Sequence, residues 1–78
     1  MIRKEKKLVI TFHTTAEAMK METVCRARGA GGRLIPVPAS ISAGCGLAWC
    51  AGLEQEEALR ELMRDAEIVP QEIQSCLV

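Results

Sequence analysis

Leu8-Val9-Ile10-Thr11-Phe12, followed after His13 by Thr14-Thr15-Ala16-Glu17, is the stretch that decides the fold. The first segment is β-branched and aromatic and divides its side chains between two faces, which predicts a strand. In the second segment the Thr14 hydroxyl can accept from the third helical amide while the Glu17 side chain reaches back. This pattern is a capping box, and it predicts that a helix begins directly after the strand.

The rest of the chain continues this alternation of strands and helices. The first helix is expected to end near Arg28, because Gly29 tolerates the positive φ that stops a helix. The prolines within residues 34–38 cannot donate to a central ladder, so this segment is predicted to be an edge strand. The full order is a strand at 8–12, a helix ending near 28, strands at 34–38 and 47–51, a helix over 54–66 and a strand over 73–78.

The order β-α-β-β-α-β favours an α+β, ferredoxin-like fold, in which two helices cover one face of a four-stranded antiparallel sheet. The strands at 8–12 and 47–51 are then central neighbours. Val9, Thr11 and Cys76 would lie on the opposite, open face. An open apolar face of this size often finds a partner, so a homodimer through that face is possible on this interpretation.

Length and charge narrow the function. The chain has 78 residues, enough for a single domain over 1–78, with a basic segment at 1–6 that is expected to fray. A core this small argues against an enzyme built around a large cofactor, and no cofactor is expected. Ten basic and ten acidic residues cancel, which argues against a general nucleic-acid or membrane-surface binder. No apolar run is long enough to cross a bilayer or resembles a signal peptide, so a cytoplasmic location is expected.

The four cysteines are expected to serve different purposes. They show neither C-x-x-C nor paired histidine spacing, so no structural zinc site is expected. Cys45 lies between Gly44 and Gly46 in a predicted loop, where no neighbouring side chain shields the sulfur. Loop amides and a nearby helix start would lower the pKa of this thiol and make it a nucleophile. The alternative is that the glycines only form the turn and Cys45 simply fits there.

The predicted topology gives Cys45 its neighbours. The loop at 39–46 should lie at the same end of the sheet as His13, Thr14 and Thr15, which could donate hydrogen bonds to a group held on Cys45. The alternative, which is the more common role of a histidine after a strand, is that His13 only caps or solvates the chain end. Cys50 would lie about 16 Å along the strand from Cys45, which is beyond disulfide reach. Cys25 is expected to pack in the core. Cys50 and Cys76 are expected either to pack in the core or to lie on the face of the sheet.

One longer motif carries a family resemblance: Arg33-Leu34-Ile35-Pro36-Val37-Pro38, then Ile41-Ser42-Ala43-Gly44-Cys45-Gly46-Leu47-Ala48. Over roughly residues 7–78 the chain resembles the selenium/sulfur carrier-like proteins, formerly classed as a domain of unknown function. The resemblance implies that Cys45 holds sulfur or selenium as a persulfide or perselenide and passes it from a donor protein to an acceptor protein. Ser42, Gly44 and Gly46 would then line the cargo. The chain departs from the family at Trp49-Cys50, near which relatives carry an arginine.

Two other classes of function remain open at this point. The chain could be a non-catalytic interaction or dimerisation module in which Cys45 is incidental. It could also be a soft-metal carrier that uses Cys45 and His13. Metal carriers of this fold generally bind through a C-x-x-C loop after the first strand, and residues 13–15 contain no cysteine, so no metal ligands are assigned.

Overall fold

The computed structural model describes residues 5–38, 41 and 46–77. They form the elements in the predicted order, with a short 3₁₀ turn, η1, before the second helix. The elements are β1 (Lys6–Thr11), α1 (Thr15–Arg28), β2 (Arg33–Pro36), β3 (Leu47–Ala51), η1 (Leu53–Gln55), α2 (Glu56–Asp65) and β4 (Glu72–Leu77).

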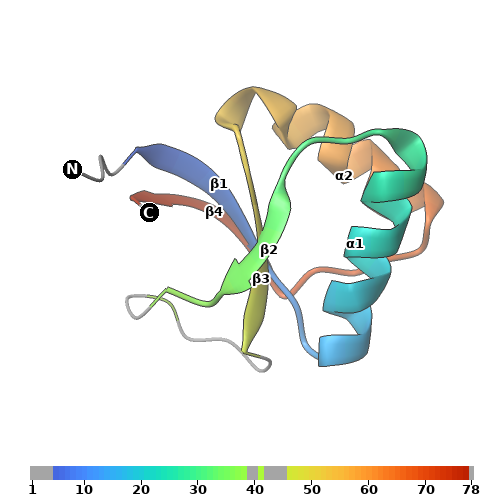
Figure 1. Ribbon diagram of the computed structural model, residues 1–78, viewed down its shortest axis with the longest axis horizontal. Helices are drawn as coiled ribbons and strands as arrows, with labels where there is room; N and C mark the ends of the chain where they lie inside the picture. Colours follow the sequence, from blue (N-terminus) through green and yellow to red (C-terminus); the bar gives the residue numbers. More distant parts are fainter. Residues whose placement is uncertain (1–4, 39–40, 42–45, 78) are drawn as a thin grey trace.

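The four strands form one antiparallel sheet in the order β2-β3-β1-β4. Figure 1 shows both helices on the same side of this sheet. The predicted ferredoxin-like arrangement is therefore confirmed, and so are the central pairing of β1 with β3 and the edge position of β2. Within the part of the chain that the structure describes, no helix is long and apolar enough to span a membrane.

The strand boundaries differ from the predicted ones in ways that have local causes. β1 begins at Lys6, because its first two residues pair with Leu77 and Cys76 of β4, and it ends at Thr11 rather than Phe12. β2 stops at Pro36, although the Val37 N–H still donates to the carbonyl of Gly46 at 3.0 Å. Pro38 has no N–H with which to extend the ladder.

Both ends of α1 follow the predicted chemistry. Thr14 has extended φ and ψ, and its Oγ1 accepts from the Glu17 N–H at 3.2 Å, as the capping box predicts. The Thr14 hydroxyl also lies 3.4 Å from Oε1 of Glu17, to which it donates. At the other end Gly29 takes a left-handed conformation with φ of 69°, and the Ala30 N–H closes onto the carbonyl of Cys25 at 2.8 Å.

The hydrophobic core lies between the sheet and the two helices. β1 contributes Leu8 and Ile10 on its helix-facing side, and Phe12 follows directly after the strand, fully buried. α2 supplies the apolar stripe that its spacing predicts. The buried helix residues in contact with these strand residues are Ala18, Met21 and Cys25 of α1 and Leu59, Leu62 and Met63 of α2.

Trp49 also belongs to this core and ties two loops to the sheet. Its indole N–H donates to the carbonyl of Gly31 at 3.2 Å, and the Gly31 N–H donates to Oε1 of Gln55 at 3.0 Å. Gly32 has φ of 113°, and a Cβ there would collide with the Trp49 indole and the Cys50 carbonyl. The connection from α1 to β2 is therefore held close against β3.

The opposite face of the sheet carries Val9 and Thr11, as predicted, and no described element covers it (Figure 1). Both residues are nevertheless 0 % exposed. The strands on either side of β1 present side chains to the same face, and these enclose the centre of the sheet. The margins of the face carry charge, including Lys7 and Arg33. Much of the apolar centre of this face is therefore already buried within one chain. A homodimer through this face stays a prediction.

Replacing Thr14 by alanine should lower the free energy of unfolding by about 1 kcal/mol, because the Glu17 N–H loses its capping acceptor. Urea denaturation followed by circular dichroism measures this. Thr23→Ala is the matched control, since Thr23 lies within the exposed face of the same helix. It should leave stability unchanged or raise it by roughly half a kcal/mol. Equal losses in the two variants would contradict a specific role for the cap.

Stability should also fall at alkaline pH because of Cys25. Burial raises the pKa of this thiol from 9.0 to about 11. Between these two values the unfolded chain releases the proton and the folded chain keeps it, so rising pH favours unfolding. This one group should remove about 1.4 kcal/mol per pH unit across that window. Denaturation midpoints from pH 8 to pH 11 would show the slope, and Cys25→Ala should flatten it. An unchanged slope in that variant would contradict the assignment.

Candidate functional site

The first candidate site lies at the end of the sheet where the predicted carrier loop is attached. Pro36 pairs with Leu47, and the hydrogen bond from Val37 to Gly46 closes the base of the connection between β2 and β3. Gly46 is exposed at this base. Three of the predicted site residues, Ser42, Gly44 and Cys45, lie outside the described residues.

His13, Thr14 and Thr15 are all exposed where β1 leads into α1. The ladder between β1 and β3 ends at the pair Thr11 and Ala48, so the chain leaves β1 at the end of the sheet where β3 begins. Figure 1 shows the start of α1 and the start of β3 toward this same end. The Thr14 hydroxyl is engaged by Glu17 in the helix cap, whereas the side chains of His13 and Thr15 are exposed.

A second group of chemically active side chains lies on the open face of the sheet, around Cys50. Cys50 is the register partner of Val9 on β1 and of Arg33 on β2. Directly opposed residues have Cβ atoms about 4.5–5.5 Å apart on the same face. Lys7 lies two residues before Val9 and is therefore a diagonal neighbour of Cys50. Pairing of strands distant in sequence thus brings a thiol and two cations together.

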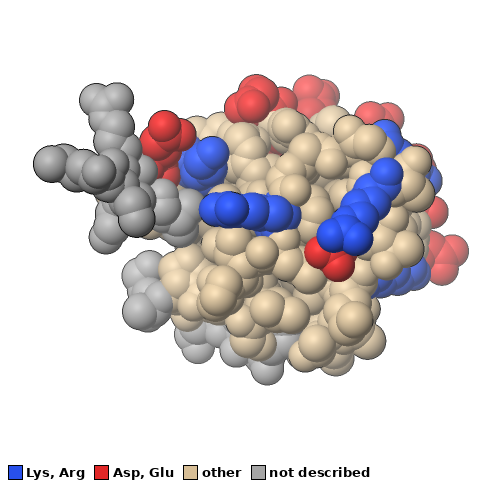
Figure 2. Space-filling view, viewed as in Figure 1, with Lys and Arg blue, Asp and Glu red and all other residues tan. Residues whose placement is uncertain are grey.

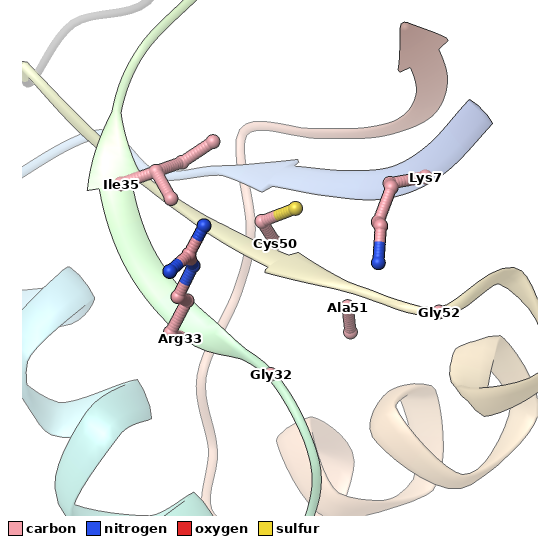
Figure 3. Close-up of a pocket in the computed structure, with 7 residues that line it drawn as sticks. All are labelled: Lys7, Gly32, Arg33, Ile35, Cys50, Ala51 and Gly52. Carbon is pink, nitrogen blue, oxygen red and sulfur yellow. The ribbon is translucent and has the colours of Figure 1, made fainter. Parts of the chain in front are cut away.

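These side chains surround a shallow hollow of about 380 Å³. Cys50 is 8 % exposed and forms part of the floor. In Figure 3 its sulfur lies between the guanidinium of Arg33 and the ammonium of Lys7. The hollow is lined by Lys7, Arg33, Ile35, Cys50 and Ala51, and by the glycines at positions 32 and 52.

The two cations of this hollow differ in how much of their charge is offset. Lys7 Nζ lies 3.7 Å from Oε2 of Glu5, and both side chains are well exposed. Such a pair contributes about 0–1 kcal/mol and leaves the ammonium free to turn toward another anion. No acidic group of residues 5–38, 41 and 46–77 forms an ion pair with Arg33. Figure 2 shows basic side chains over the strands, with an acidic side chain directly beside one of them.

Cys76 lies on the same face, opposite Lys7 across β1 and β4. Burial, with a smaller effect from Cys50, raises the pKa of this thiol, so it stays protonated at neutral pH. β1 separates Cys76 from Cys50, and two strand spacings amount to about 10 Å, which is beyond disulfide reach. Both cysteines are free thiols, and so is Cys25. The predicted packing role of Cys25 and sheet-face positions of Cys50 and Cys76 are confirmed.

The sequence alone did not identify Lys7 and Arg33 as neighbours of Cys50. Alternation along β3 could have shown that Ala48 and Cys50 share the open face. The partner of Cys50 on β2, however, depends on the register between two strands joined by residues 37–46, and no local pattern determines that register. Among the described residues there is no cluster of three or more His, Cys, Asp or Glu side chains that could hold a metal ion.

Comparison with known proteins adds the family. Searches of curated proteins and of solved structures gave no match. The family model described as "Putative Se/S carrier protein-like" matches residues 7–75, which include every described strand and helix except the ends of β1 and β4. The match covers far more than half of the chain. The chain therefore belongs to the Se/S carrier protein-like family.

Proposed function

We propose that this protein is a carrier that holds sulfur or selenium on Cys45 and passes it between partner proteins. The observation that carries the proposal is the family match over residues 7–75. The cargo would be a persulfide or perselenide, Cys45–S–SH or Cys45–S–SeH. A carrier needs one solvent-accessible sulfur on a stably folded domain. A small domain in which two helices cover one face of a sheet is sufficient for this.

The described surroundings support this assignment through the base of the loop. Gly46, the residue after Cys45, is exposed and hydrogen-bonded to Val37, so the loop begins and ends on the sheet. His13 and Thr15 are exposed at the same end and could supply donors to a terminal anion. Thr14 contributes mainly by fixing the start of α1, because its hydroxyl is part of the cap.

The transfer step is a thiol exchange. The Cys45 thiolate attacks the outer sulfur of a donor persulfide, R–S–SH, and forms Cys45–S–SH while the donor leaves as R–S⁻. An acceptor nucleophile then attacks the same outer sulfur and restores the Cys45 thiolate. Selenium follows the same course when the donor carries R–S–SeH. No electrons are gained or lost overall, so the protein needs no redox cofactor of its own.

The partners in this proposal are a donor protein and an acceptor protein, each docking long enough for one exchange. Donors of the required chemistry include cysteine desulfurases and selenocysteine lyases, which form an enzyme-bound persulfide or its selenium analogue. The proposed location is the cytoplasm, where thiols stay reduced. The described cysteines are free thiols, which is compatible with that setting.

The direct test is loading by a cysteine desulfurase with cysteine as substrate, followed by intact-mass and peptide mapping. The wild-type protein should gain the mass of one sulfur atom on the peptide containing Cys45. Cys45→Ser should abolish this gain, because the accepting thiolate is absent. Loading of Cys45→Ser equal to that of the wild type would overturn the proposal.

Cys76→Ser is the matched control, since it removes a different thiol whose raised pKa keeps it protonated at neutral pH. This variant should load like the wild type. Loss of loading in Cys76→Ser with loading retained in Cys45→Ser would assign the chemistry to the sheet face instead.

A further inference from the structure

The hollow on the open face has features that the carrier proposal does not use. It lies between β1, β2 and β3, its floor includes the nearly buried side chain of Cys50, and Arg33 and Lys7 stand on either side of that sulfur (Figure 3). The thiol of Cys50 is free and has no hydrogen-bond partner among the described residues. A partly enclosed floor with a cation on either side is complementary to a small anion.

The charges around the hollow are unevenly distributed, and Arg33 is the group that attracts an anion most strongly. Glu5 partly offsets Lys7. The carboxylate of Glu54 lies against Gly52, which follows β3 on the side of Lys7. Arg33 is an exposed residue and pairs with no acidic side chain in the described part of the chain.

We propose that this hollow is a binding site for a small oxyanion, which Arg33 and Lys7 hold over the thiol of Cys50. The planar guanidinium of Arg33 suits two oxygens of a tetrahedral anion, and the ammonium of Lys7 supplies a second charge from the opposite side. The partly enclosed floor strengthens these interactions relative to open solvent. Neither the family match nor the proposed carriage on Cys45 assigns any role to these three residues.

The shape of the hollow supports a small ligand. At about 380 Å³ and open to solvent, it is at the low end of the size range of ligand pockets. Its apolar contribution comes from Ile35 and Ala51, with no aromatic ring among the lining residues on which a nucleobase could stack. Inorganic sulfate and phosphate are therefore the appropriate probes.

The test is titration of the ¹⁵N-labelled protein with sodium sulfate and, separately, with sodium phosphate. Saturable shifts are expected in the backbone amides of Gly32, Arg33, Cys50 and Gly52. Sodium chloride at matched ionic strength should not reproduce them. Arg33→Gln should weaken binding about tenfold, through loss of one charge-assisted contact. Lys7→Gln should weaken it less, because Glu5 already offsets that charge.

Arg28→Gln is the control for net charge, because Arg28 is bound to Asp65 at 3.3 Å at the end of α1. It should bind sulfate like the wild type. The proposal is overturned if sulfate and phosphate give no saturable shifts, if chloride gives the same shifts, or if Arg28→Gln weakens binding as much as Arg33→Gln. Cys45→Ser should leave oxyanion binding unchanged, so the outcome is independent of persulfide loading.

Discussion

The pairing of β1 with β3 on one side and β4 on the other is the interaction on which the rest of the structure depends. Leu8 and Ile10 of β1 lie against the helices, while Val9 and Thr11 of the same strand are fully buried on the other face. A strand buried on both faces has little freedom to change register, because a slip by one residue would exchange its two sets of side chains. Both candidate sites take their geometry from this strand. Its carboxyl end leads to the start of α1, at the end of the sheet where β3 begins, and its amino end supplies Lys7 to the hollow.

Local patterns predicted the parts of the fold that local chemistry controls. The Thr14 cap, the left-handed Gly29 and the proline-limited edge strand each need only neighbouring residues, and each was found as predicted. The partner of Cys50 across β2 is different, because it depends on how residues 37–46 join two strands. A slip of two residues would have set Arg33 beside Ala48 or Gly52, with every side chain still on its proper face. The order of the strands could therefore be predicted from the sequence, but the hollow could not.

The two sites lie at different places along the same strand. Gly46 precedes β3, and Cys50 lies near its far end, about 13 Å further along an extended chain. A group bound beside Gly46 would therefore lie far from one bound over Cys50. Cys50 is also held within the sheet ladder, so its sulfur moves only by changes of rotamer. The family match assigns no role to Cys50, so the proposed oxyanion site does not depend on the family relationship.

A charge at position 33 also has a structural role that does not involve a ligand. A charged residue on an edge strand keeps that edge from pairing with another sheet. Protection of the edge, however, is already provided by Pro36, which removes an N–H from β2. Arg33 also lies on the open face, beside Cys50, with its guanidinium next to the hollow (Figure 3). Edge protection accounts for a charge on this strand but not for its position beside a nearly buried thiol, and that position is what favours a ligand.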